Sequence, residues 1–322
     1  MSAEVSKIPE SVKKRLEKQQ YRIAGNHSAV KLCTWLKHAL KDEGYCYKQK
    51  FYGIKSHRCL QCTPSTIWCN LRCIFCWRSA SWYYKTAMGK VDDPATIVDG
   101  LIEQQRRLLA GYNPKANKYV SEKKYQEALE PKHAAISLSG EPTFYPLLSE
   151  LIEEFHSRGM TTFLVTNGTN PDVLASLDPL PTQLYVTLIA PTKELFKKTA
   201  RPSIPLNEAW NRVMETIDLL PSLNTRKVMR LTLVPGYNMA EPHKYAEFFL
   251  KSEAHFLEPK GFMSVGDARK RLPYEIMPRF EKIYEFSQQI IEGTELKIID
   301  QKEDSAVTLI AKEDYSWRKL KF

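Results

Sequence analysis

Three cysteines lie close together in the segment STIWCNLRCIFCWR, which covers residues 65–78. Cys69, Cys73 and Cys76 have the spacing C-x3-C-x2-C, and neither a histidine nor a fourth cysteine follows closely. A metal centre that takes four ligands would receive only three from this segment. A [4Fe–4S] cluster bound through three cysteines leaves one iron open to a small molecule. The spacing therefore favours a cluster with one open coordination position.

A structural zinc site is the main alternative for these residues. Structural zinc is tetrahedral and takes four protein ligands. Cys59 and Cys62, together with Cys73 and Cys76, form a possible quartet with zinc-ribbon spacing. This quartet separates Cys69 from its two neighbours, whereas the cluster hypothesis keeps the trio together. With zinc, the chain would be a zinc-dependent RNA-binding module rather than an enzyme.

A second set of cysteines precedes the first. Cys33, Cys46 and Cys59 follow one another at intervals of thirteen residues, in a basic segment rich in aromatic residues. Scattered buried thiols are an ordinary alternative, but a core is not expected in this segment. The regular interval indicates a second site with three protein ligands, and it leaves Cys62 unassigned.

The elements that must position these residues alternate between strands and helices. Strand candidates are short apolar runs with the β-branched character of buried parallel strands. These runs are 66–68, 134–138, 161–165, 184–189, 228–234 and 256–260. Helical patterns lie at 94–110, 147–157, 207–219, 242–251 and 276–291. Before the first strand, residues 1–44 read as two helices broken near Gly25-Asn26, and residues 45–64 read as a loop.

Six strand–helix units in series predict a parallel sheet. Polar sequence follows nearly every strand at its carboxyl end, which favours a curled partial barrel over an open doubly wound sheet. The expected fold class is α/β, with a partial (βα)6 barrel similar to a TIM barrel. We expect a basic, helical and cysteine-rich extension at 1–64, the barrel at 65–295 with a charged surface insertion at 111–133, and a β extension at 296–322.

Charge and hydropathy limit the class of protein. The chain has 322 residues and a formal charge of +10, and residues 1–58 contain thirteen Lys and Arg against five Asp and Glu. A basic face favours a polyanion such as nucleic acid, although a solvated surface explains charge equally well. No apolar run is long enough to span a bilayer, and the N-terminus is not a signal peptide. We expect a cytoplasmic monomer whose cysteines bind metal, with no membrane partner.

The first trio, with Phe75 before its last cysteine, resembles the signature of the radical S-adenosylmethionine (SAM) superfamily. The resemblance implies that the open iron binds SAM and that the reduced cluster cleaves it to a 5′-deoxyadenosyl radical. Residues 139–143 (SGEPT) look like the superfamily's GGE-type segment, with Ser in place of the first Gly; such a segment is also a good turn. The SAM contacts implied by the resemblance are Gly140, Glu141, Thr166, Asn167 and Thr187.

The two cysteine sets together resemble those of the TYW1 family, the tRNA 4-demethylwyosine synthases. The family's VG-x-x-R-x-R-L segment is similar to residues 265–272, and the resemblance covers essentially the whole chain. It implies a second [4Fe–4S] cluster on Cys33, Cys46 and Cys59. Without the flavodoxin domain of eukaryotic members, the chain resembles the short archaeal type, which implies an external electron donor of the flavodoxin or ferredoxin type.

The reaction is also implied by this resemblance. The SAM-derived radical takes hydrogen from the methyl group of N1-methylguanosine 37 in tRNA-Phe, and two carbons of pyruvate then close a third ring to give 4-demethylwyosine. The enzyme class is a carbon–carbon lyase. Pyruvate offers a carboxylate and a carbonyl oxygen to the open iron of the second cluster. Lys48, with Lys50 nearby, is the matching position for a Schiff base with pyruvate, and such an amine needs a lowered pKa.

The tRNA must present a base that has left its stack. Candidate phosphate contacts are basic residues of 1–58, Lys115, Lys118, Lys123, Lys124, Arg269 and Arg271. Aromatic residues that could stack on bases or pack in the core are Trp77, Trp82, Tyr83 and Tyr84. A radical SAM enzyme with a different substrate is the other alternative, and a lack of affinity for N1-methylated tRNA would favour it.

Overall fold

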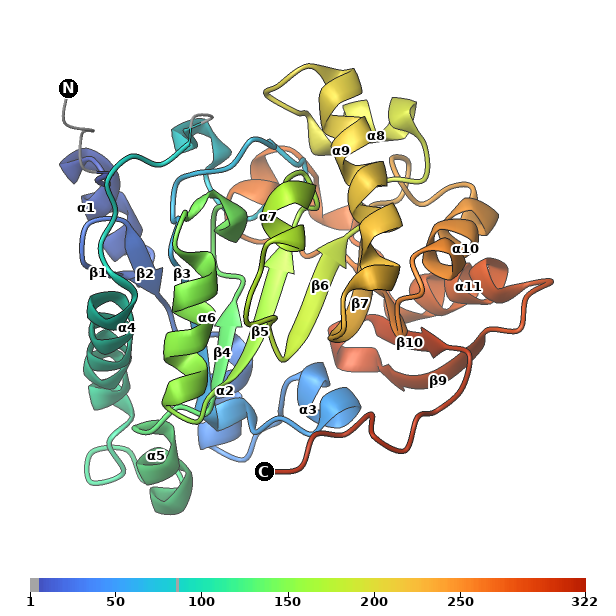
Figure 1. Ribbon diagram of the computed structural model, residues 1–322. Coiled ribbons are helices and arrows are strands. Elements are labelled where there is room, and N and C mark those ends of the chain that lie inside the picture. Colours follow the sequence, from blue (N-terminus) through green and yellow to red (C-terminus); the bar gives the residue numbers. More distant parts are fainter. Residues whose placement is uncertain (1–5, 85–86) are drawn as a thin grey trace.

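The computed structural model describes residues 6–84 and 87–322, which contain one continuous ten-stranded sheet (Figure 1). The order of the strands in the sheet is β1-β2-β3-β4-β5-β6-β7-β8-β10-β9. The strands are β1 (Arg22–Ala24), β2 (Ser28–Val30), β3 (Cys59–Thr63), β4 (His133–Ile136), β5 (Thr161–Thr166), β6 (Gln183–Thr187), β7 (Arg226–Leu233), β8 (Phe256–Gly261), β9 (Lys297–Lys302) and β10 (Val307–Ala311).

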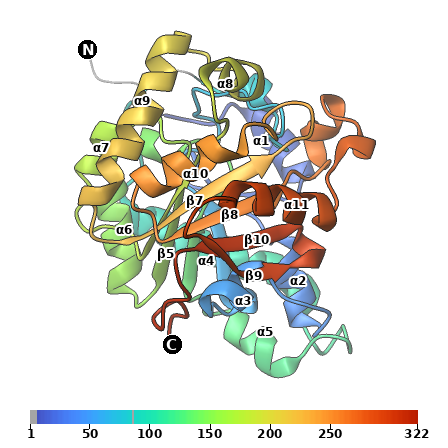
Figure 2. The same cartoon turned by 90° about the vertical axis from the view of Figure 1, so that its right-hand side faces the viewer.

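Strands β3 to β8 are parallel, and antiparallel strands extend this central part at both edges. Figure 2 shows β10 beside β8 and β9 beyond it. Since β1 and β9 are the two ends of the order, the sheet curls without closing. The expected partial barrel of six parallel strands is confirmed.

Helices follow most of the parallel strands, as the alternating pattern predicted. The α-helices are α1 (Glu10–Lys18), α2 (Thr34–Leu40), α3 (Tyr47–Tyr52), α4 (Pro94–Leu109), α5 (Glu122–Ala128), α6 (Leu148–Ser157), α7 (Pro171–Ala175), α8 (Lys193–Ala200), α9 (Leu206–Leu219), α10 (Pro242–Lys251) and α11 (Phe280–Ile291). The start of α4 was predicted correctly: Pro94 occupies its first turn, and the Asp93 side chain caps it by accepting a hydrogen bond from the Thr96 N–H at 3.0 Å.

The first predicted strand is wrong. The first parallel strand is β3 at Cys59–Thr63, which pairs with β4, whereas residues 66 and 67 form a turn and Trp68 makes an isolated bridge to Tyr84. The Thr66 N–H bonds to the carbonyl of His27 and the Trp68 N–H to that of Ser65, so neither extends the ladder to β4. Pro64 follows the strand and has no N–H to donate, which ends the pairing. The apolar run at 66–68 is buried by this turn.

The N-terminal segment also differs from its prediction. Residues 1–44 were read as two helices, but a hairpin of β1 and β2 lies between α1 and α2, with Gly25 and Asn26 in its turn. Residues 45–64, read as a loop, contain α3 and β3. The sheet therefore runs across the boundaries predicted at 64 and 295, and the division into three parts stays a prediction.

The two faces of the sheet carry different cores. On the outer face, α4 and α6 cover side chains such as Leu60, Ile136 and Leu184. On the inner face, α3 packs its aromatic residues against Phe163, Tyr185 and other side chains of β5 to β8. Figure 1 shows α3 at the end where the parallel strands begin, together with α2 and α5. A helix at the amino ends of the parallel strands thus directs its own side chains into the barrel.

The charged insertion forms α5, which was not predicted. The insertion ends where β4 begins, so α5 lies at the amino ends of the parallel strands (Figure 1). Among the helices of the described residues, none is both long and apolar enough to cross a membrane.

Candidate active site inside the barrel

The first cysteine trio lies in the long loop between β3 and α4. Cys69 is buried, and Cys73 and Cys76 are half-buried. Burial raises the pKa of Cys69 to about 12, and the nearby carboxylate of Glu141 adds to the effect. Burial likewise raises the pKa of Cys73, and the thiols of Cys76 and Cys69 are the next causes. The three thiols therefore lie near one another. Such thiols stay protonated until a metal's positive charge replaces the protons.

The predicted GGE-type segment lies directly against this loop. Gly140 has φ +70°, and a Cβ there would lie 1.8 Å from the carbonyl oxygen of Ser65, so only glycine allows the approach. The Glu141 N–H donates to the carbonyl of Trp68 at 2.7 Å. These contacts join the end of β4 to the segment that immediately precedes Cys69.

The carboxylate of Glu141 organises the carboxyl ends of β4 and β5. It accepts hydrogen bonds from the hydroxyls of Thr143 (2.8 Å) and Thr166 (2.7 Å) and from the Asn167 N–H (2.8 Å). The side-chain amide of Asn167 lies 3.8 Å from the Cys69 sulfur. Of the carboxylate's oxygens, Oε2 accepts only the Asn167 bond in the described residues, which leaves capacity for a ligand ammonium. Gly140, Glu141, Thr166 and Asn167 thus gather beside the trio.

The segment at 265–272 holds the same loop in place through hydrogen bonds. The guanidinium of Arg271 donates to the carbonyls of Ile74 (3.0 Å) and Cys76, and Arg269 donates to Ser264 at 2.7 Å. The Asp267 N–H donates to the carbonyl of Trp77 at 3.0 Å. Both arginines were predicted as phosphate contacts, which stays a prediction: Arg271 donates to the two loop carbonyls, whereas Arg269 uses only its Nε atom and its side chain is exposed.

The second cysteine set meets on the inner side of the barrel. Cys33 precedes α2, Cys46 precedes α3, and Cys59 begins β3. Burial raises the pKa of Cys33 to about 11, with the Cys46 thiol as the next cause. Burial and then the thiols of Cys33 and Cys46 raise the pKa of Cys59. Three chain segments therefore deliver one thiol each to a shared buried place.

Each cysteine set supplies the three thiols that a [4Fe–4S] cluster with one open iron would need. Backbone N–H groups point at two of the sulfurs, from Leu36 to Cys33 (3.3 Å) and from Leu71 to Cys69 (3.5 Å), and such bonds are a usual feature of cluster sites.

The zinc-ribbon quartet is not formed. Cys59 and Cys62 lie three residues apart on β3, so their side chains leave opposite faces of the sheet. Cys62 is 1% exposed and packs in the outer core, whereas Cys59 faces the other thiols. Cys62 is thus a core residue.

Lys48 projects from α3 into the barrel, beside the second cysteine set. It is 9% exposed, and its nitrogen lies 4.1 Å from the centroid of the Tyr185 ring and 5.5 Å from that of Phe163. Burial lowers its pKa, an effect opposed by the carboxylate of Glu258. Lys50 is different, because it pairs with Asp300 at 2.9 Å. Of the two predicted lysines, only Lys48 is directed at the interior.

Sequence reasoning missed three charged residues around Lys48. Glu258 on β8 is fully buried and accepts hydrogen bonds from the hydroxyls of Tyr47 (3.0 Å) and Tyr52 (2.5 Å). Arg230 on β7 donates to the Thr187 hydroxyl at 3.3 Å. Burial lowers the pKa of Lys260 to about 8, and its ammonium bonds to the Ser305 carbonyl. The sequence signal that could have found these residues is a charged side chain within a run expected to be a buried strand. Thr187, predicted as a SAM contact, accepts the Arg230 bond at the end of β6, next to the end of β5.

The aromatic and basic candidates for tRNA contact divide into two groups. Trp77 (36%) and Tyr84 (42%) are exposed near the first trio, whereas Trp82 and Tyr83 pack against the core. In the insertion, the side chains of Lys115, Lys118 and Lys123 are exposed, and Lys124 pairs with Asp42.

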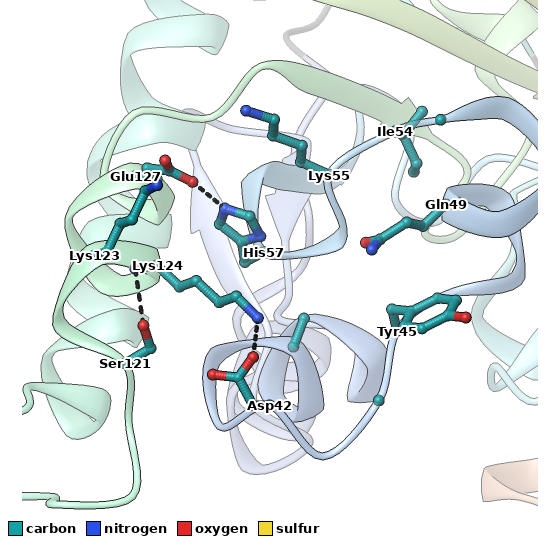
Figure 3. Close-up of a pocket in the computed structure, with 13 residues that line it drawn as sticks. Asp42, Tyr45, Gln49, Ile54, Lys55, His57, Ser121, Lys123, Lys124 and Glu127 are labelled. Atoms are coloured by element: carbon teal, nitrogen blue, oxygen red, sulfur yellow. Dashed lines mark hydrogen bonds and ion pairs between the residues drawn. The ribbon is translucent and has the colours of Figure 1, made fainter. Parts of the chain in front are cut away.

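A separate pocket lies outside the barrel, between α2, α3 and α5 (Figure 3). Its charged groups are largely paired with each other, Lys124 with Asp42 and His57 with Glu127 at 2.5 Å. Lys48 is not among its lining residues. The candidate active site is therefore the barrel interior.

Comparison with known families agrees with this arrangement. Residues 63–249 match the family model of the radical SAM superfamily, and residues 251–312 match the one described as wyosine base formation. The first match covers more than half of the chain, so this protein belongs to the radical SAM superfamily, whose members use SAM and a [4Fe–4S] cluster.

Full-length relatives narrow the family further. The chain is 49% identical over 312 residues to the S-adenosyl-L-methionine-dependent tRNA 4-demethylwyosine synthase of Pyrococcus abyssi, covering 95% of this chain and 90% of that protein. Its identity to the protein of the same name from Methanocaldococcus jannaschii is 41%, covering 95% and 97%. The chain therefore belongs to the tRNA 4-demethylwyosine synthase family, which confirms the predicted resemblance.

Solved structures give the same result. A structure of TYW1 with a lysine-pyruvate adduct bound has a TM-score of 0.86 at 40% identity, covering 97% of this chain and 98% of that one. A crystal structure of archaeal TYW1 has a TM-score of 0.79 at 38% identity, covering 97% and 100%.

Proposed function

We propose that this protein converts N1-methylguanosine 37 of tRNA-Phe to 4-demethylwyosine with two carbons of pyruvate. Relatives that align over nearly their whole length are named S-adenosyl-L-methionine-dependent tRNA 4-demethylwyosine synthases, which supports the same activity here. The reaction makes a new carbon–carbon bond and discards part of pyruvate, so we assign it to the carbon–carbon lyases.

The observation that carries this proposal is the position of Lys48. Its amine is buried between the second cysteine set and the inner face of β6, over the Tyr185 ring. A structural relative is described with a lysine-pyruvate adduct bound. A buried amine in the barrel of the same family supports the corresponding role for Lys48.

The chemistry at Lys48 is Schiff-base formation with the ketone of pyruvate. The amine nitrogen attacks the carbonyl carbon, a C–N double bond replaces the C–O double bond, and the oxygen leaves as water with two hydrogens from nitrogen. The enclosure of Lys48 by Tyr185 and Phe163 limits access of water to the product. The fixed amine also orients the pyruvate carbons for attack by the substrate radical.

Two clusters and SAM complete the proposed site. Cys69, Cys73 and Cys76 would hold the cluster that binds SAM, with Gly140, Glu141, Thr166 and Asn167 beside it. Cys33, Cys46 and Cys59 would hold the second cluster. When bound, SAM and its cluster supply the hydrogen-abstracting radical, and the second cluster supplies a Lewis acid for the 2-oxo acid. Thr187, at the end of the neighbouring strand β6, is proposed to contact SAM as well.

Partners and location belong to the same proposal. An external flavodoxin- or ferredoxin-type protein would reduce the clusters, and tRNA would bind through exposed lysines and the aromatic residues Trp77 and Tyr84. A reducing cytoplasm would keep seven cysteines free of disulfides. We propose that the protein acts there as a monomer.

One assay tests the proposal as a whole. Purified protein with both clusters is incubated without oxygen with SAM, pyruvate, a reductant and N1-methylated tRNA-Phe. The nucleosides are then analysed by mass spectrometry. The expected product is 4-demethylwyosine, and ¹³C at C2 and C3 of pyruvate should enter it. If N1-methylguanosine persists while SAM is cleaved, a different substrate is indicated.

A further inference from the structure

Arg230 and Glu258 lie side by side on two adjacent strands of the barrel. They are register partners in β7 and β8, and Thr187 is the partner of Arg230 on β6. Because side chains alternate along a strand, Arg230 shares the inner face with Val228, which packs in the inner core. The guanidinium is therefore inside the barrel, on the face that Lys48 approaches from α3.

The guanidinium of Arg230 lacks a charged partner in the described residues. Both oxygens of Glu258 are directed at the hydroxyls of Tyr47 and Tyr52, and no ion pair joins Glu258 to Arg230 in residues 6–84 and 87–322. The Thr187 hydroxyl accepts one long bond. The Nε atom is buried and has no hydrogen-bond partner within that part of the chain. The side chain as a whole is half-buried, but this buried N–H without an acceptor is costly, and an anionic ligand would supply both the acceptor and the missing charge.

The surroundings of Arg230 are predominantly positive. Two other basic side chains enter the same space: the Lys48 nitrogen lies 4.1 Å from the centroid of the Tyr185 ring, and the Lys260 nitrogen lies 5.4 Å from that of Tyr47, whose hydroxyl bonds to Glu258. Lys260 is committed to the Ser305 carbonyl. Lys48 is the proposed nucleophile. Arg230 is thus the one of these three cations whose donors are available.

We propose that Arg230 binds the carboxylate of the 2-oxo acid whose ketone reacts with Lys48. A planar guanidinium matches a carboxylate with two parallel N–H donors, which makes it the preferred group for this ligand. In a 2-oxo acid the carboxylate is attached directly to the ketone carbon, so one small ligand can reach both groups. This inference rests on the proposed role of Lys48 and adds the residue that selects a charged ketone over a neutral one.

The test uses protein with both clusters and measures capture of a ketone on Lys48. Pyruvate is titrated in the presence of sodium cyanoborohydride, and the reduced adduct is quantified on the Lys48 peptide by mass spectrometry. Methyl pyruvate, the same ketone without the negative charge, is titrated in parallel. Arg230→Gln should raise the half-saturating pyruvate concentration about 10- to 100-fold, the usual loss for a charge-assisted hydrogen bond, and leave that of methyl pyruvate unchanged. Arg230→Lys should recover part of the loss.

A matched control separates charge at this place from charge in general. Arg226 lies four residues earlier on the same face of β7, but its donors are used by the carbonyls of Trp317 and Arg318 and by Gln183. Arg226→Gln removes the same charge and should leave the preference for pyruvate over methyl pyruvate intact. Melting temperatures of both variants report whether the fold is retained.

Four results would overturn the assignment. Arg230→Gln could leave the pyruvate titration unchanged, or weaken both ketones equally, which would indicate a structural role. It could instead weaken SAM binding alone, which would mean that Arg230 holds the carboxylate of SAM. If wild-type protein captures no pyruvate at all, the proposed role of Lys48 fails and the Arg230 assignment fails with it, a result distinct from the other three.

Discussion

The guanidinium of Arg271 donates a hydrogen bond to the backbone carbonyl of Cys76, across almost two hundred residues of chain. A second bond reaches Ile74 at 3.0 Å. The family segment at 265–272 therefore supports the loop of the first cysteine trio, which ties a distant part of the chain to the proposed SAM cluster.

Loss of this support should loosen the loop. Arg271→Gln leaves two loop carbonyls without their donors, so iron should be lost to a chelator faster than from the wild type, with slower SAM cleavage. Lys270→Gln is the matched control, because its side chain is 75% exposed and pairs only with Asp267. Equal rates of iron loss from the two variants would refute the supporting role. The measurement is the decay of absorbance near 400 nm.

Substitution of Gly266 should lower the stability of the fold, because this glycine packs closely against the same loop. It has φ +55°, and a Cβ would lie 2.3 Å from the carbonyl oxygen of Trp77. Gly293 also has a positive φ, of +70°, but nothing lies within 4 Å of its Cβ position. Gly293→Ala should therefore cost about 1–2 kcal/mol from backbone strain alone, and Gly266→Ala clearly more. Urea unfolding of the two variants compares the costs, and similar values would show that the contact with Trp77 is unimportant.

The two cysteine sets should lose their clusters separately. Cys69→Ala should abolish formation of 5′-deoxyadenosine and remove about four irons per chain, while Cys46→Ala should remove the same number and spare SAM cleavage. Cys62→Ala is the control, because that thiol packs in the outer core. Iron content and 5′-deoxyadenosine are measured for each. Unchanged iron in Cys46→Ala would disprove the second site.

His133 should make the fold sensitive to acid. Its Nε2 accepts a hydrogen bond from the Lys55 N–H at 3.1 Å and its Nδ1 lies 2.8 Å from the Thr161 hydroxyl, so the folded state holds the neutral ring. Burial, reinforced by the charge of Arg58, lowers the pKa of His133 to about 3. Below about pH 6.5 only the unfolded chain binds a proton here, so stability should fall by about 1.4 kcal/mol per pH unit.

Comparison with His133→Gln isolates this effect. The variant has no titrating ring, so its free energy of unfolding should depend less steeply on pH between about 6.5 and 5.5. Urea unfolding at several pH values in that range gives both slopes. Parallel curves for the two proteins would show that His133 does not contribute.

Binding of tRNA should depend strongly on salt. The exposed lysines of the insertion, Lys115, Lys118 and Lys123, should each contribute about one unit to the slope of log K against log salt if they contact phosphates. Lys124→Gln is the comparison, because Lys124 pairs with Asp42. An unchanged slope after substitution of the three exposed lysines would show that tRNA does not contact the insertion.

The sequence predicted most of the parallel sheet, because buried parallel strands are continuous apolar runs. It misplaced the first strand, since Thr66–Trp68 is as apolar as a strand while β3 contains Gln61 and two cysteines. Local pattern also gave no sign that α3 enters the barrel. The aromatic side chains of this short helix are buried only because the inner faces of β5 to β8 meet them.

Spacing along the chain was enough to predict the first cysteine trio as one ligand set, because residues three and four apart in one loop can reach one cluster. The family followed from the same residues together with the thirteen-residue interval of the second set. Only the tertiary structure decided that Lys48 rather than Lys50 is buried, and that Arg230 lies opposite Glu258 without pairing to it. Those relationships depend on the register of β7 and β8 and on the docking of α3, which are contacts between segments far apart in sequence and leave no local pattern.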